Sequence, residues 1–149
     1  MHSSVSLLLL LLSASMSITT LLPAKANDEA ALLAFKAAAV GGHGDTLVSW
    51  NGSAGGFCSW EGVKCGAKGR VVSLSLPSQG LTGVLSLAVG NLSSLRLLNL
   101  SSNWFSTGGI PASLGCLHRL QALDLSNNAF SGELPANLSS CINLMFMAL

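Results

Sequence analysis

Charged residues are scarce in this chain of 149 residues, at 9% of the total, against about 25% in a typical soluble domain. The seven Lys and Arg nearly balance the six Asp and Glu. This composition excludes the clustered positive charge of a nucleic-acid-binding protein and the charge-rich make-up of a disordered tail. Tyrosine is absent and aromatic residues reach only 5%. The length is too short for a kinase domain, a barrel enzyme or a Rossmann enzyme of usual size, and it accommodates one small domain.

Much of the hydrophobicity lies at the amino end. Residues 5–12 read VSLLLLLL, and apolar and small residues continue to residue 22. Ala24-Lys25-Ala26 then presents small residues at the spacing that signal peptidase requires. A membrane span needs about 20 consecutive apolar residues, and serines and threonines interrupt this run from Ser13 onward. We therefore predict a cleaved signal peptide over 1–26, although its start carries no Lys or Arg, and a mature chain without a transmembrane span.

Secretion permits disulfides and gives meaning to Asn-x-Ser/Thr sequences. Four such sequons occur in the chain. The glycosylation candidates are Asn51, Asn91, Asn99 and Asn137.

The segment after the leader, NDEAALLAFKAAAVGG, predicts a short amphipathic helix. Asn27 or Asp28 can cap its amino end, and the paired glycines at 41–42 end it. Leu32 and Phe35 fall on one face, which must pack against another part of the chain because so short a helix is marginal alone. The aromatic residues that can supply this partner surface are Trp50, Phe57 and Trp60.

The four cysteines fall into two pairs by their spacing in the sequence. Cys58 and Cys65 bound the sequence CSWEGVKC, and in a secreted chain they are expected to form a disulfide. A metal site is the poorer alternative because further ligands at close spacing are missing. Cys116 and Cys141 are expected as free thiols, with a bridge between them as the alternative that geometry must decide.

The most informative feature is an internal repeat. Four segments align: VVSLSLPSQGL, LRLLNLSSNWF, LQALDLSNNAF and LMFMAL, beginning at residues 71, 95, 120 and 144. The steps between them are 24, 25 and 24 residues. The consensus is L-x-x-L-x-L-x-x-N, followed by a G-x-I/L-P segment. A repeat of this length is typical of a solenoid.

The repeat has a direct physical interpretation. Its alternating leucines predict a short strand with apolar side chains directed inward. Asn103 and Asn128 follow where the chain turns, and there a buried amide can satisfy backbone groups of neighbouring coils. Gln79 occupies this position in the first repeat and should do so less well. No single coil buries its apolar side, so the coils must stack.

These motifs resemble the start of the ectodomain of plant leucine-rich-repeat receptor-like kinases and receptor-like proteins. The resemblance rests on DEAALLAFK at 28–36, LVSWN at 47–51, CxWxGVxC at 58–65 and the G-x-I/L-P element of the repeats. It implies an α/β solenoid with a helical, disulfide-closed amino-terminal cap over 27–69. About three and a half plant-type repeats follow over 70–149, with a short parallel sheet on the concave face. The family resemblance also implies recognition of a protein or peptide ligand or a co-receptor.

The sequence shows none of the motifs of a kinase domain, namely G-x-G-x-x-G, H-R-D and D-F-G. Its histidines and carboxylates form no catalytic set, and His118 falls at an outward position of the repeat. We therefore expect no enzymatic activity, no metal and no cofactor. The chain ends inside the strand of its fourth repeat, so we expect a truncated array whose last apolar strand is uncovered.

The candidate binding surface consists of the outward strand positions on the concave face. They are Ser73, Ser75, Leu97, Asn99, Ser101, Ala122, Asp124, Ser126 and Phe146. This face is small, polar and nearly uncharged, and it is poor in the aromatic and Arg anchors that dominate many interfaces. A glycan on Asn99 would obstruct it, so we expect that sequon to be unused.

Three functional hypotheses remain open from the sequence. The first is the amino-terminal part of a leucine-rich-repeat receptor that recognises proteins or peptides at the cell surface, in signalling or defence. The second is a stand-alone secreted protein that acts as a decoy or as an inhibitor of a foreign cell-wall hydrolase. The third is a truncated product without independent activity. All three imply the secretory pathway, and the destination is the apoplast or the exterior of the plasma membrane.

Overall fold

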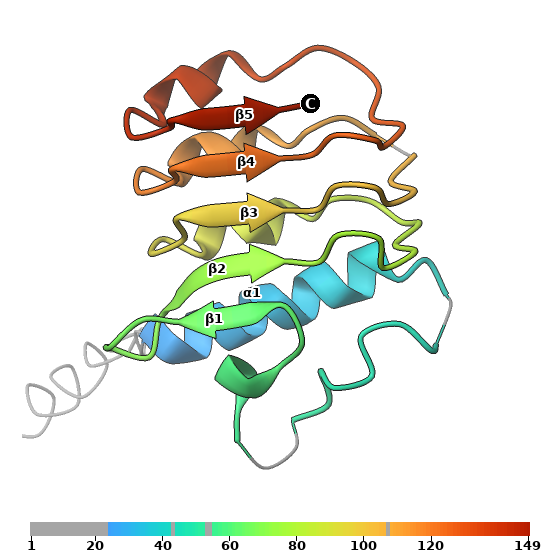
Figure 1. Cartoon of the computed structure of the whole chain (residues 1–149), viewed down its shortest axis with the longest axis vertical. Coiled ribbons are helices and arrows are strands. Elements are labelled where there is room, and N and C mark those ends of the chain that lie inside the picture. Colours follow the sequence, from blue (N-terminus) through green and yellow to red (C-terminus); the bar gives the residue numbers. More distant parts are fainter. Residues whose placement is uncertain (1–23, 43, 53–54, 107) are drawn as a thin grey trace, which may run out of the picture.

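The computed structural model describes residues 24–42, 44–52, 55–106 and 108–149. Nearly all of the predicted signal peptide therefore lies outside the described residues. The chain builds one α-helix, four 3-10 helices (η) and five strands within these ranges (Figure 1). In chain order they are α1 (Ala24–Ala39), η1 (Phe57–Ser59), β1 (Val63–Cys65), β2 (Val71–Ser75), η2 (Leu87–Asn91), β3 (Leu97–Asn99), η3 (Ala112–Cys116), β4 (Ala122–Asp124), η4 (Ala136–Ser140) and β5 (Phe146–Ala148).

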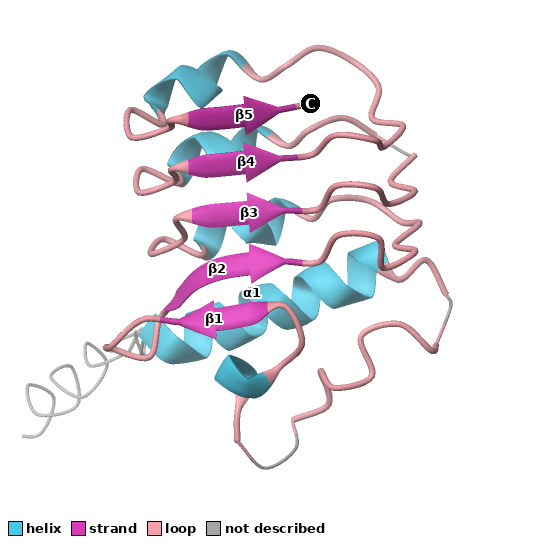
Figure 2. Cartoon of the chain, viewed as in Figure 1, coloured by secondary structure: helices cyan, strands magenta, loops and turns pink. Residues whose placement is uncertain are grey.

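The strands form one sheet in the order β1-β2-β3-β4-β5, and α1 and the 3-10 helices η2–η4 lie behind it (Figure 2). Strands β2 to β5 pair in parallel, which confirms the predicted solenoid. Strand β1 pairs antiparallel with β2, and the sequence analysis did not predict it. The CxWxGVxC segment therefore also starts the sheet.

The inward leucines of the repeat form the core as predicted. Leu74, Leu98 and Leu123 are fully buried, and the next apolar position of each coil is equally covered. In the last coil the equivalent side chains remain about half exposed, at 47% for Met147 and 49% for Leu149. Each coil thus depends on its neighbour for burial, as expected for stacked repeats.

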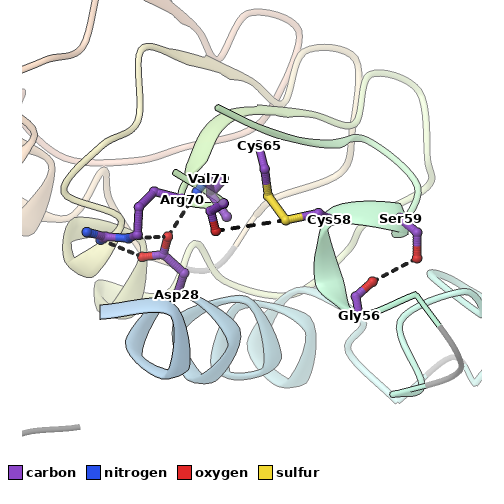
Figure 3. The surroundings of a disulfide bond; sticks show 8 residues. Asp28, Gly56, Cys58, Ser59, Cys65, Arg70 and Val71 are labelled. Carbon is purple, nitrogen blue, oxygen red and sulfur yellow. Dashed lines mark hydrogen bonds and ion pairs between the residues drawn. A yellow bond between two sulfur atoms is a disulfide. The ribbon is translucent and has the colours of Figure 1, made fainter. Parts of the chain in front are cut away.

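Helix α1 begins at Ala24, one turn earlier than predicted, and Asp28 does not cap it. Alanine and lysine favour the helix, so the sequence Ala-Lys-Ala extends it. The buried Asp28 carboxylate instead accepts hydrogen bonds from Arg70 Nε and Nη2, both at 2.8 Å, and from the backbone N–H of Val71 at 2.9 Å (Figure 3). This carboxylate fastens the helix to the start of β2.

The other end of α1 is fastened to the first coil. The carbonyls of Ala38 and Ala39 accept hydrogen bonds from the backbone N–H groups of residues 82–84 at 3.0–3.1 Å. These carbonyls have no partner within the helix, so the coil satisfies them. Gly41 and Gly42 follow at φ 56° and 90°, which confirms the predicted helix end.

The remainder of the cap is held by a disulfide and by aromatic packing against α1. Cys58 and Cys65 form the predicted disulfide, with their Cα atoms 5.5 Å apart (Figure 3). Closing a loop of this length contributes about 2–3 kcal/mol in the chain-entropy account. Trp50 stacks on Trp60 at 5.3 Å between ring centroids and meets Phe35 of the helix at 5.9 Å. Of the aromatic residues predicted to face the helix, Trp50 thus contacts it directly, while Trp60 packs on Trp50 and Phe57 packs on Trp60.

Asn103 joins two coils through its side chain. Its Oδ1 accepts hydrogen bonds from the backbone N–H groups of Gln79 and Leu81, and its Nδ2 donates to the carbonyls of Leu76 and Leu100. Asn128 repeats this arrangement one coil later. By contrast, the side-chain amide of Gln79 donates only to the exposed carbonyl of Pro77 at 3.3 Å. Both predicted roles are confirmed.

Candidate functional site

The outward strand positions lie together on the solvent side of the sheet, which we call the sheet face. Parallel pairing sets two columns across the coils. The first column is Ser73, Leu97, Ala122 and Phe146, and the second is Ser75, Asn99, Asp124 and Ala148. The structure thus brings the predicted surface residues into one continuous array.

Local hydrogen bonds hold the second column in place. Asn99 Oδ1 accepts from the backbone N–H of Ser101 at 3.0 Å and from its hydroxyl at 2.8 Å. Asp124 Oδ1 accepts from the same two groups of Ser126, at 3.0 and 2.6 Å. These bonds restrict the two side chains, so a contact made through them would cost little side-chain entropy.

The turns beyond β2–β4 extend the sheet face. Ser78, Ser102 and Asn127 adopt left-handed backbone conformations with φ of 55–56°. Their positions repeat with the coil period, and the Ser102 N–H donates to the carbonyl of Ser126 in the next coil at 2.9 Å. The turns are consequently stacked in register with the strands.

Charge on the sheet face is sparse. Asp124 is acidic, and Lys64 of β1 lies beside Ser73 in the sheet register. Phe146 supplies an aromatic ring that is 53% exposed. The face is suited to contacts with backbone amides and uncharged side chains of a partner more than to strong ion pairing.

The four sequons differ in their surroundings. The predicted glycosylation candidates Asn51, Asn91 and Asn137 are exposed, whereas Asn99 is half-buried within the sheet face. Asn137 Nδ2 donates to the carbonyl of Ala112 at 2.6 Å. Asn91 is the last residue of η2, which lies behind the sheet (Figure 2).

The second cysteine pair is reduced in the structure. Cys116 is exposed and Cys141 is buried, and neither forms a disulfide. The Cys141 thiol donates to the carbonyl of Leu114 at 3.3 Å. Burial raises the pKa of the Cys141 thiol, and the nearby Cys116 adds to this rise.

Within the described ranges, no three His, Cys, Asp or Glu side chains converge as a metal-ligand set. His118 is exposed, and its ring nitrogen Nδ1 lies 3.5 Å from the carbonyl of Ser140. The helices in this part of the chain all fall short of the length or apolar character of a membrane span.

A basic group of side chains that was not predicted from the sequence lies at the end of the sheet where the strands begin. Lys68, Arg70, Arg96 and Arg119 line one cavity there. They are separated in sequence but each precedes or begins a strand segment. Arg70 and Arg119 directly precede the first apolar residue of a repeat, and Arg96 directly follows one, so the repeat spacing of these charges is the signal that could have revealed them.

Comparison with known proteins matches two family profiles in succession. The profile described as leucine rich repeat N-terminal domain covers residues 25–66, and the leucine rich repeat profile covers residues 69–130. The chain is 47% identical over 85 residues to the receptor kinase-like protein Xa21 of Oryza sativa subsp. japonica. That match covers 53% of the chain and 8% of the relative, so the chain spans a small part of its relative's length.

Solved structures show the same likeness. The BIR2 ectodomain from Arabidopsis thaliana matches with a TM-score of 0.71 and 35% identity, over 78% of this chain and 63% of that one. The plant peptide hormone receptor RGFR1 in complex with RGF2 matches with a TM-score of 0.54 and 31% identity, over 62% of this chain and 18% of the receptor. The cap, the repeats and these matches agree, and the chain belongs to the leucine-rich-repeat family, with similarity to the ectodomains of plant receptor-like kinases.

Proposed function

We propose that the chain is the amino-terminal part of an extracellular recognition module that binds a protein or peptide ligand or a co-receptor. The observation that most supports this proposal is the sheet face, where two columns of outward side chains continue across β2–β5. The similar receptor RGFR1 is described as a peptide hormone receptor in complex with RGF2. That likeness supports a peptide or protein as the class of ligand here.

The proposal gives the chain a binding role without catalysis. The similarity to receptor kinases falls on the cap and repeats, and the chemistry of the sheet face is that of contact and hydrogen bonding. The proposed setting is the secretory pathway and the cell exterior, because the matched ectodomain of BIR2 has the same architecture. A stand-alone decoy or hydrolase inhibitor is the alternative within the same fold.

A photo-crosslinking experiment tests the proposal. A photoreactive phenylalanine analogue replaces Ala122 on the sheet face in one variant and exposed Ala136, in η4 behind the sheet, in the matched control. Both proteins are irradiated in extracellular fluid from plant tissue, and adducts are identified by mass spectrometry. We expect a discrete peptide or protein adduct at position 122 that Asn99→Arg reduces. Equal labelling at 136, or none at 122, would contradict the proposal.

A further inference from the structure

Four of the chain's seven Lys and Arg residues line one cavity of about 310 Å³ at the side of the sheet formed by the amino-terminal ends of the strands. Lys68 and Arg70 come from the loop that joins β1 to β2. Arg96 lies directly before β3, and Arg119 lies before β4. Ala67 and Val72 supply apolar lining. We call this surface the basic edge.

The positive charge of the basic edge is largely uncompensated. Among the described residues, the one ion pair joins Arg70 to Asp28. Lys68, Arg96 and Arg119 are exposed and have no side-chain hydrogen bond or ion pair in the described structure. No carboxylate lines the cavity. A nearly neutral chain therefore concentrates unpaired cations on one edge, which attracts an anionic partner.

The coil spacing sets the shape of that partner. Neighbouring strands lie about 4.8 Å apart, so the basic edge extends about 10 Å from the coil of β2 to that of β4. An extended peptide advances about 3.3 Å per residue, and three residues cover this distance. The planar guanidinium groups of Arg96 and Arg119 can each bind a carboxylate through two hydrogen bonds.

The lining favours a peptide over an acidic carbohydrate. No aromatic ring borders the cavity, so a sugar ring has nothing to stack on. Ala67 and Val72 offer contact for the aliphatic part of acidic side chains. We propose that the basic edge binds an acidic segment of a partner polypeptide, with two or more carboxylates within about three residues. This site is separate from the sheet face and does not depend on the function proposed for it.

Binding of fluorescein-labelled hexaglutamate to the full chain, made through the secretory pathway, tests the proposal by fluorescence anisotropy. We expect saturable binding at low salt that weakens at 0.5 M salt because exposed charges are then screened. The double variant R96Q/R119Q should weaken binding about tenfold, since it removes two exposed charge contacts. Circular dichroism establishes that each variant remains folded.

The control variant V48E/A136E changes net charge by the same amount at exposed positions away from the basic edge. It should bind hexaglutamate as the unmodified chain does. Equal losses in both variants, or no loss in R96Q/R119Q, would overturn the proposal. Tetragalacturonate that binds as well as or better than hexaglutamate would also overturn it, because the edge would then recognise anions without preferring a peptide.

Discussion

At the scale of single residues, the side-chain amide of Asn103 provides hydrogen-bond partners for several buried backbone groups at once. Its side chain is 4% exposed and contacts backbone groups both of its own coil and of the preceding one. These groups cannot reach water once the coils stack. A buried polar group without a partner costs about 1–3 kcal/mol, so this side chain is a large contributor to coil stacking.

Replacing Asn103 with Ala should lower the free energy of unfolding by about 3 kcal/mol or more, because several buried backbone groups lose their partner at once. Urea denaturation followed by circular dichroism measures the change. Gln79→Ala is the matched control at the same repeat position and should change stability by less than about 0.5 kcal/mol. Comparable losses in the two variants would show that the amide network is not what stabilises this turn.

Cys116 and Cys141 should differ in reactivity. At pH 8, iodoacetamide should modify exposed Cys116 and spare buried Cys141, whose pKa is raised by burial and by Cys116. Peptide mass spectrometry measures the labelling, and both thiols should react in urea. Early labelling of Cys141 in the folded protein would contradict the prediction.

The same pKa shift predicts a loss of stability in alkali. The folded state favours the neutral Cys141 thiol, so the contribution of this thiol to stability is complete below the ordinary pKa of 9.0 and is lost as pH rises through the higher pKa of the folded state. Between pH 8 and 10, the unmodified chain should therefore lose more stability than Cys141→Ala, as measured by thermal melts across this range. Parallel pH profiles for the two proteins would show that this thiol does not titrate with folding.

At the scale of elements, the docking of α1 depends on a close approach at Gly83. A Cβ atom at this position would overlap the carbonyl oxygen of Ala38, and the Gly83 N–H donates to Ala39 O at 3.0 Å. Glycine is therefore needed for contact, since a side chain would displace the helix end from the first coil.

Gly83→Ala should lower the melting temperature by several degrees because the helix must move away from the coil that satisfies its last carbonyls. Differential scanning calorimetry measures this shift. Gly44→Ala is the matched control, because a Cβ atom there meets nothing within 4 Å. A melting temperature unchanged by Gly83→Ala would mean that the helix and coil tolerate separation.

Sequence reasoning succeeded for elements that repeat and was weaker where a single contact decides. Leucine spacing located β2–β5 because every coil places the same side chains inward. The start of α1 was predicted too late because aspartate is a common helix cap. The Asp28 carboxylate instead accepts hydrogen bonds from Arg70 and Val71, which lie 42 and 43 residues away. The basic edge was missed because its cations approach one another only after the coils stack.

At the scale of the whole molecule, the two outer strands of the parallel array β2–β5 differ. The outer side of β2 is covered by β1, which pairs with it antiparallel, whereas the outer side of β5 has no strand paired to it in the described structure. Large apolar side chains accompany the free edge, including Ile142 at 84% and Met145 at 81% exposure. An unpaired strand edge with apolar neighbours promotes association.

A polypeptide of residues 27–149 should therefore self-associate, as measured by sedimentation velocity over a range of concentrations. Adding a capping repeat after Leu149 should restore a monomer and raise the melting temperature, by about 4 °C for each kcal/mol gained at this size. A monomeric fragment whose melt is indifferent to the added cap would show that the β5 edge is tolerated.

The direction of the asparagine bonds has a consequence for synthesis on the ribosome. Asn103 reaches back 24 residues to the N–H of Gln79, and Asn128 reaches back 23 residues to that of Phe105. Because translation proceeds from the amino end, the turn of each newly made coil cannot form these hydrogen bonds until the asparagine of the next coil has been synthesised. At about 5–20 residues per second, that delay is roughly 1–5 s per coil. Elongation speed thus sets how long each nascent turn stays exposed to chaperones and to the enzymes that attach glycans.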